Sequence, residues 1–115
     1  MLAELKSRYP QLYSDCRGIF CGEGWRMLIE NASAELDALA QLEGVIVSIE
    51  DIRKKYGVLN IWATTSSAPS GLAADEIANR FETESERVCE FCGAGGKLRE
   101  KRRWLSVRCN KCEVK

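Results

Sequence analysis

The most regular pattern of apolar positions in the chain lies between Glu23 and Leu42. Apolar residues recur there at offsets of 0, 3, 4, 7, 11 and 14, which is the spacing of one face of an α-helix. They are Trp25, Leu28, Ile29, Ala32, Leu36 and Leu39. Charged residues occupy the opposite side, and Gly44 is a typical helix stop. The pattern predicts a long amphipathic helix over residues 23–43 as the main core helix.

A second apolar stripe, which starts at Ala74 and includes Phe81, predicts an amphipathic helix over residues 72–88 with a strongly charged outer face. A β-branched run predicts a strand over residues 45–49, and alternating apolar positions predict another over 58–64. The remaining expectations are a short helix over residues 2–8, a helical or turn-like segment over 50–57, and a loop over 66–71 that serves as a hinge.

Four of the six cysteines form two C-x-x-C units, which are separated by sixteen residues. Each unit allows two thiolates to converge on one ion from a tight turn, and two units supply the four sulfurs of a tetrahedral site. The spacer suits a β-hairpin that carries the chain from one turn to the other, and GAGG after the first unit is typical of a turn that needs positive φ. We therefore expect one zinc ion bound by Cys89, Cys92, Cys109 and Cys112.

A site of this kind is closed, because four protein ligands leave no position for water or substrate. The chain has no histidine, so the commonest general base is missing, and it has no Walker loop, Rossmann fingerprint or nucleophile elbow. We expect a structural zinc, no enzymatic activity and no small-molecule substrate.

The other two cysteines, Cys16 and Cys21, are too few to complete a second metal site. Their C-x4-C spacing leaves open a redox pair, but free cysteine more often behaves as a small buried hydrophobe, and we favour that interpretation.

Together these elements predict an α+β fold with a small, mainly helical body, a short β element and a C-terminal four-cysteine zinc ribbon. We expect residues 1–71 to form the body and residues 72–115 to form the charged helix and ribbon, packed as one compact domain. With 115 residues, 45% of them apolar, the chain is long enough for one core. It contains no run of eighteen apolar residues and no apolar leader, so we expect a cytoplasmic protein that does not enter a membrane.

The formal net charge is zero, but the charges are separated along the chain. Residues 97–115 contain eight basic and two acidic residues, whereas residues 1–96 contain nine basic and fifteen acidic ones. A basic tail permits contact with nucleic acid, and mutual neutralisation of the two parts is an equally good explanation.

Three segments resemble small zinc-ribbon proteins of unknown function from bacterial and prophage genomes. They are GEGW-x-x-LI, KKYGVLNIW, and the junction of a charged helix with C-E-F-C-G-A-G-G, which lie at residues 22–29, 54–62 and 82–96. The resemblance implies the same order of parts over residues 20–112. In that family the last ligand pair often includes a histidine, whereas this chain has Cys109 and Cys112.

Two functions are compatible with these features. The first is binding to a protein partner, as an immunity or inhibitor protein that neutralises a bacterial toxin by covering its active site. The alternative is binding to nucleic acid through the basic hairpin at residues 97–108. The aromatic residues least committed to a helix core are Tyr9, Tyr13, Phe20, Trp62 and Trp104, and the candidate partner surface consists of Trp62, Arg99, Arg102, Arg103 and Trp104.

Overall fold

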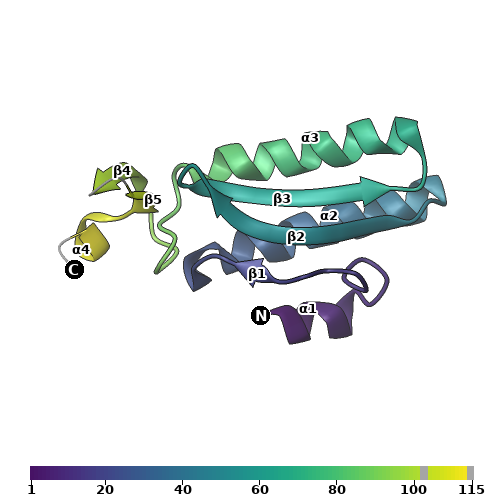
Figure 1. The fold of residues 1–115 in the computed structure, drawn as a ribbon, viewed down its shortest axis with the longest axis horizontal. Helices are drawn as coiled ribbons and strands as arrows, with labels where there is room; N and C mark the ends of the chain where they lie inside the picture. The colour runs from purple at the N-terminus through teal and green to yellow at the C-terminus, as the bar shows by residue number, and fades with distance from the viewer. Residues whose placement is uncertain (102–103, 114–115) are drawn as a thin grey trace.

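The computed structural model describes residues 1–101 and 104–113. Its elements are α1 (Leu2–Arg8), β1 (Ile19–Phe20), the 3-10 turn η1 (Glu23–Trp25), α2 (Arg26–Glu43), β2 (Val47–Lys55), β3 (Val58–Thr65), α3 (Ala68–Ser85), β4 (Lys97–Lys101), β5 (Trp104–Arg108) and α4 (Asn110–Glu113). Figure 1 shows their arrangement, with β4, β5 and α4 at one end of the long axis.

A three-stranded sheet in the order β1-β2-β3 forms the centre of the body. The short strand β1 runs parallel to β2, and β2 pairs with β3 in antiparallel fashion across the two-residue turn Tyr56–Gly57. The register shifts between Ile49 and Asp51, where β2 has a bulge. The bulge places Asp51 opposite Trp62 and Ile52 opposite Ile61.

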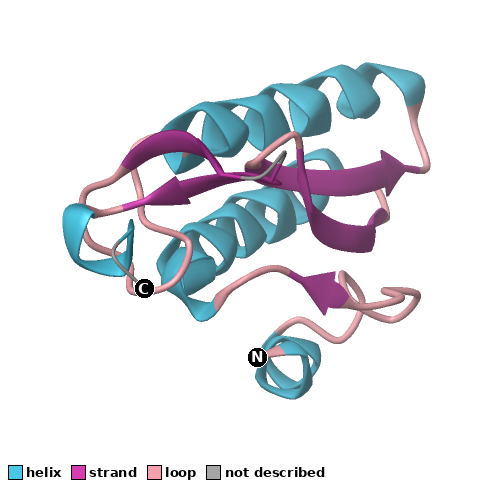
Figure 2. Ribbon diagram, turned by 60° about the vertical axis from the view of Figure 1, so that its left-hand side comes forward, coloured by secondary structure: helices cyan, strands magenta, loops and turns pink. Residues whose placement is uncertain are grey.

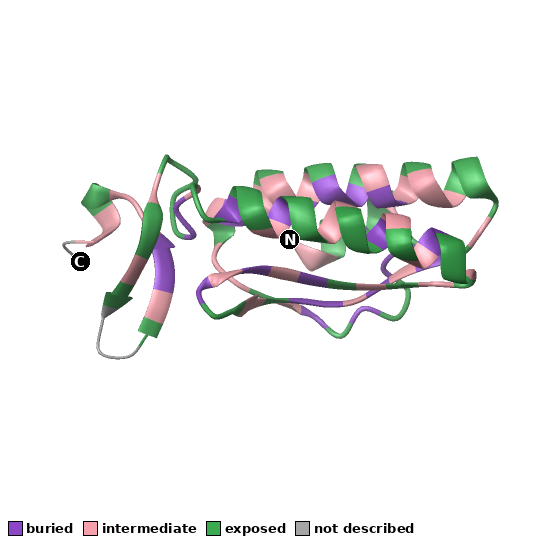
Figure 3. Cartoon of the chain, turned by 90° about the horizontal axis from the view of Figure 1, so that it is seen from above, coloured by how far each residue is buried: buried purple, intermediate pink, exposed green. Residues whose placement is uncertain are grey.

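One face of the sheet carries the core. Ile49 and Ile52 of β2 and Leu59 and Ile61 of β3 point to this face and are buried. They join a single hydrophobic cluster with Trp25 of η1 and with residues of both long helices, including Ile29, Leu36, Ala74 and Phe81. Helices α2 and α3 lie side by side on this face, as Figures 1 and 3 show. The body is therefore a two-layer α/β arrangement with its apolar interior between the layers.

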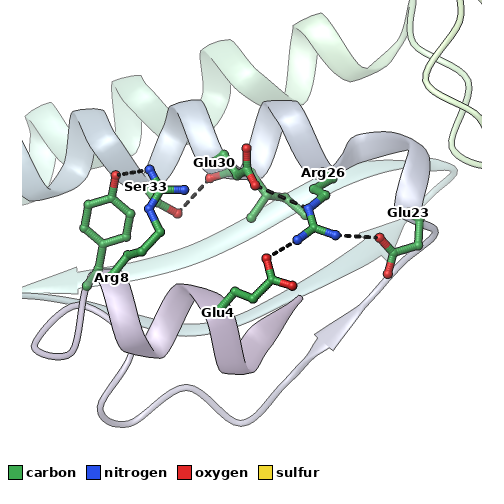
Figure 4. A network of polar contacts seen from close by, with 8 residues as sticks. Glu4, Arg8, Glu23, Arg26, Glu30 and Ser33 are labelled. Atoms are coloured by element: carbon green, nitrogen blue, oxygen red, sulfur yellow. Dashed lines mark hydrogen bonds and ion pairs between the residues drawn. The ribbon is translucent and has the colours of Figure 1, made fainter.

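Polar contacts attach the N-terminal segment to α2. The hydroxyl of the buried Tyr13 is 2.5 Å from that of Ser33, which also donates to the carbonyl of Ile29 at 2.7 Å. Near the start of α2, the Arg26 guanidinium contacts carboxylates on three segments, as Figure 4 shows. Its partners are Glu4, Glu23 at 3.6 Å and Glu30 at 3.3 Å.

The structure confirms the α+β class and the long helix, which ends at Gly44 in the left-handed conformation. Three expectations were wrong. Residues 50–55 continue β2 instead of forming a helix or turn, because the bulge interrupts the alternation that marks a strand. The supposed hinge at 66–71 is largely helical, since α3 starts at Ala68 with Pro69 in its first turn. The β element is also longer than expected, with nine residues in β2 and eight in β3.

Helix α3 also ends earlier than expected, at Ser85. The Ser85 hydroxyl accepts from the backbone N–H of Leu59 at 2.9 Å and so joins the helix end to β3. Residues 86–88 form the connection to the first cysteine pair. Among the residues that the structure describes, no helix is both long and apolar enough to cross a membrane.

Candidate metal centre

The four cysteines of the two C-x-x-C units lie together beyond the end of α3. The Sγ atoms of Cys89, Cys92, Cys109 and Cys112 are all within 4.8 Å of one another. The Sγ atoms of Cys92 and Cys109 are 3.6 Å apart. The hairpin β4–β5, shown in Figure 2, brings the second pair back to the first.

The first pair, Cys89 and Cys92, lies on a tight turn that depends on the glycine after Cys92. The N–H of Gly93 donates to the carbonyl of Cys89 at 2.9 Å, and the N–H of Cys89 donates to the carbonyl of Ala94 at 2.7 Å. Gly93 has a φ of +83°, which a residue with a side chain rarely adopts. The prediction that the GAGG segment contains a positive-φ turn is therefore confirmed at this position.

The second pair lies at the start of the short helix α4. The N–H of Cys112 donates to the Sγ of Cys109 at 3.4 Å, and the N–H of Glu113 donates to the carbonyl of Cys109 at 3.0 Å. Arg99 supports this turn from β4, since its guanidinium donates to the carbonyl of Arg108 at 3.1 Å and to the side chain of Asn110 at 2.7 Å. Backbone hydrogen bonds thus shape both turns, and the Arg99 side chain supports the second one.

The four thiols differ in environment. Cys89 is fully buried, Cys92 is exposed, and Cys109 and Cys112 are half-buried. Burial acts to raise the pKa of Cys89, but hydrogen bonds with the backbone of Cys109 and Cys92 outweigh it and lower that pKa to about 6. Hydrogen bonds to the side chains of Cys109 and Cys89 raise the pKa of Cys112 to about 12. The pKa of Cys109 is also lowered, first by its hydrogen bond with the backbone of Cys112, so two of the four thiols ionise more readily than a free cysteine.

This donor set fits a soft metal ion. Four converging thiolates match the tetrahedral sulfur coordination of structural zinc, and an iron ion accepts the same cage. All four coordination positions would belong to the protein, so the arrangement can hold an ion but leaves it no position for a reacting molecule.

Glu90, between the first two cysteines, attaches the ribbon to the body and was not singled out from the sequence. Its side chain is buried, and its carboxylate accepts from the N–H of Gly22 at 3.2 Å and from the Lys54 ammonium at 3.1 Å. Its backbone accepts from the N–H of Gly24 at 2.7 Å and donates to the carbonyl of Val107 at 2.9 Å. One residue thereby contacts η1, β2 and β5.

The glycines of the G-E-G segment serve this docking. A Cβ atom on Gly24 would lie 2.1 Å from the carbonyl oxygen of Cys89, and one on Gly22 would lie 2.4 Å from that of Glu90. The adjacent Trp25 donates its indole N–H to the carbonyl of Val88 at 2.8 Å. The sequence gave no local signal of this contact between the G-E-G segment and the backbone of Cys89 and Glu90, because the two segments lie far apart along the chain.

The candidate partner residues do not form one surface. Trp62 lies on β3 in the body, whereas Trp104 lies on β5 in the ribbon, and both are exposed. Arg99 is engaged by the metal-site turn, as described above. Arg102 and Arg103 lie outside the described residues. Of the five aromatic residues proposed as free of a helix core, Tyr13 is buried against α2, so that expectation was wrong for it.

Cys16 and Cys21 lie away from the four-cysteine cluster, in the segment around β1. Cys16 is buried and Cys21 is half-buried, and neither is joined in a disulfide. Burial raises the pKa of both thiols, to about 12 for Cys21. These environments are typical of packing thiols and not of reactive ones.

Comparison with known proteins gives no relative. No family model, curated protein or solved structure shows a significant match to the chain.

Proposed function

We propose that this chain is a non-enzymatic zinc-binding protein in which one structural zinc ion holds a binding surface in place. The observation that carries the proposal is the convergence of four Sγ atoms within 4.8 Å, from two turns that are sixteen residues apart in sequence. A structural zinc site contributes its binding energy to folding. Cys89, Cys92, Cys109 and Cys112 would hold the ion, and a reducing compartment such as the cytoplasm would keep them as thiols.

The chemistry of the site supports binding and not catalysis. Thiolates in all four positions saturate zinc, and a catalytic zinc needs an open position for water. The absence of histidine from the sequence removes the commonest partner in proton transfer. The function then resides in the surfaces that the ion keeps together.

Metal content tests the proposal directly. Protein purified without chelator should contain one zinc ion per chain by elemental analysis, and Cys89→Ser should reduce this content to a small fraction. Cys16→Ser serves as the matched control, because Cys16 is also a buried cysteine but lies outside the cluster; it should retain the full zinc content. Wild-type protein whose ribbon is folded without any bound metal would contradict the proposal.

A protein partner, as in the toxin-inhibitor hypothesis, is supported by one property of the body. Helices α2 and α3 together contain eight acidic and two basic residues, so their outer side is suited to a basic protein surface. Co-expression with the product of the adjacent gene tests this role. Co-purification and protection of the cell from that product would support it, and the absence of both would remove it.

The structure gives less support to nucleic-acid binding by residues 97–108 than the sequence of this hairpin does, because some of its basic side chains contact other groups of the protein. Of its described basic residues, Arg99 is held by the metal-site turn, and Arg108 donates to the Ser106 hydroxyl at 2.6 Å and lies 5.1 Å from the Phe91 ring centre. The exposed ring of Trp104 is the feature that favours this alternative.

A further inference from the structure

The second face of the β1-β2-β3 sheet is not covered by any element that the structure describes. Helices α2 and α3 both pack on the opposite face, as Figures 1 and 3 show. The side chains of Arg53 and Trp62, which alternate with the buried residues of their strands, are exposed on this outer face. We call the set Arg17, Phe20, Asp51, Arg53 and Trp62 the outer-face cluster.

The outer-face cluster contains two arginine–aromatic pairs. The Arg17 guanidinium carbon is 5.0 Å from the centre of the Trp62 ring, and that of Arg53 is 5.9 Å from the centre of the Phe20 ring. Both rings remain accessible, since Trp62 is 50% exposed and Phe20 is 57% exposed. They lie on β3 and β1, on either side of β2, and pair with positions two residues apart on it, so their backbones are roughly 12 Å apart diagonally across the sheet.

Asp51 fixes both arginines. Its carboxylate is 2.9 Å from the Arg53 guanidinium and 3.7 Å from that of Arg17, and the residue is only 3% exposed. A buried carboxylate is costly unless it is paired, so both guanidinium groups are held beside it. The arginine side chains nevertheless keep 60% and 52% of their surface exposed for Arg17 and Arg53. They are thus oriented but still available to an anion.

An open groove of about 860 Å³ extends from this cluster across β3. It reaches Tyr56, whose exposed ring lies 5.9 Å from the Lys55 ammonium, and it is bordered on the side of α3 by Asp75. A cation therefore lies beside an aromatic ring at three places, which are Arg17 with Trp62, Arg53 with Phe20 and Lys55 with Tyr56.

The two faces of the body differ in charge. The helical layer is strongly acidic, as described above, whereas the outer face presents three exposed cations, Arg17, Arg53 and Lys55, against the buried Asp51 and the half-buried Glu50. A polyanion would be repelled from the helices and attracted to the sheet. Phosphate groups match the guanidinium ions, and aromatic faces match bases, because every base has a π face that stacks irrespective of sequence.

We propose that the outer face of the sheet binds single-stranded nucleic acid. Bases stack on Trp62, on Phe20 or on the guanidinium planes, and phosphates contact Arg17, Arg53 and Lys55. A duplex is a poorer ligand because its bases are already stacked within it. The inference rests on the proposed function only in that both describe a non-enzymatic binding protein; its residues lie outside the zinc site.

Fluorescence anisotropy tests the proposal with labelled single-stranded RNA and DNA of about 20 nucleotides and mixed sequence, and with the corresponding duplexes. We expect binding of the single strands that weakens steeply between about 50 and 200 mM salt. Trp62→Ala should weaken binding about tenfold, and Trp62→Phe should restore most of it. Arg17→Ala should weaken binding and lower the slope of log K against log salt by about one.

Arg80→Ala is the matched control, because Arg80 is also ion-paired and lies 5.2 Å from an aromatic ring centre, but on α3. It should bind like the wild type. Trp104→Ala distinguishes binding by the sheet from binding by the ribbon, and it should leave the affinity for single strands nearly unchanged. Circular dichroism of each variant verifies its fold.

Four results would overturn the proposal: no binding at low salt, equal binding of duplex and single strand, wild-type affinity in both Trp62→Ala and Arg17→Ala, or a loss confined to Trp104→Ala. Competition by polyglutamate as effective as that by RNA would assign the face to an acidic protein instead. Zinc content, measured on the same samples, keeps the outcome separate from the metal proposal. Zinc-loaded protein that does not bind RNA would contradict only the proposed binding by the outer face of the sheet.

Discussion

At the scale of single residues, Glu90 decides how the ribbon meets the body. It lies between two candidate ligands, where the local pattern indicates only a solvent-exposed position in a turn. Instead its carboxylate is buried and accepts from a backbone N–H and an ammonium group. Buried acceptors with charged partners are worth more than ordinary hydrogen bonds, and losing one leaves its donors unpaired.

Replacement of Glu90 should therefore destabilise the protein without removing a ligand. We expect Glu90→Ala to lower the free energy of unfolding by about 1–3 kcal/mol, because the Gly22 N–H and Lys54 lose their acceptor. Denaturant unfolding of the zinc-loaded protein measures this. Glu86→Ala, at an exposed position four residues earlier, is the control and should change stability little. Equal stability of the two variants would contradict the role assigned to Glu90.

The thiol of Cys21 should react slowly at ordinary pH. With its pKa raised to about 12 by burial, only about one part in ten thousand is thiolate at pH 8, and thiolate is the reactive form. Alkylation should stay slow at pH 8 and accelerate as the pH rises toward 12. Mass spectrometry follows the rate, with the exposed Ser14→Cys variant as a fast reference. Rapid labelling, or a disulfide between Cys16 and Cys21, would instead support a redox pair.

At the scale of elements, the body and the ribbon depend on different forces. The body has a shared apolar core between two helices and the sheet. In the described part of the ribbon hairpin, Val107 is the one fully buried apolar side chain. A hairpin with so little apolar burial needs another source of stability, and the proposed zinc ion would supply it.

Chelation should therefore disorder the ribbon and spare the body. Removal of zinc is expected to abolish the dispersed amide NMR signals of residues 89–112, while α2, α3 and the β2–β3 pair keep theirs. Far-ultraviolet circular dichroism should retain most of its helical signal. Unfolding of the entire chain by a chelator, or no spectral change at all, would show that this division of stabilising forces is wrong.

The sequence was most informative where one repeat of apolar positions or one motif spacing continued without interruption. Helix α2 was predicted because its apolar stripe is regular and Gly44 ends it, and the cysteine cluster was predicted because the C-x-x-C spacing imposes its own geometry. The bulge at Asp51 concealed the true length of β2. It places Ile52 on the core face, three residues after Ile49, and so breaks the two-residue alternation that identifies a strand. Contacts such as Gly24 with Cys89 depend on tertiary docking, which no local pattern encodes.

At the scale of the whole molecule, the terminal position of the ribbon makes the protein elongated. Its principal extents are 47 × 26 × 21 Å, and its radius of gyration of 14.4 Å exceeds the roughly 13 Å typical of a compact chain of this length. The ribbon contacts the body through η1, through Lys54 of β2, through Val107 in the core and at the Tyr56–Gly57 turn, where a Cβ on Gly57 would lie 2.7 Å from Leu98. The elongated shape therefore depends on these contacts.

Small-angle X-ray scattering should detect the loss of this contact. The radius of gyration is expected to increase when zinc is chelated, because a disordered segment occupies more volume than a docked hairpin. Glu90→Ala should give a smaller increase in zinc-loaded protein, since the ribbon keeps its own fold but has a weaker attachment. A radius that stays constant in both experiments would contradict the proposed dependence of shape on docking.

Trp25 can serve as an intrinsic fluorescent reporter of ribbon docking, because its indole N–H donates to the carbonyl of Val88. Trp25 is fully buried, so its emission differs from that of the exposed Trp62 and Trp104 and can be isolated in a variant without those two residues. Its indole N–H contacts the residue that immediately precedes the first candidate ligand. Displacement of the ribbon would change the polarity around this ring, so a fluorimeter could follow metal release in real time without any added label.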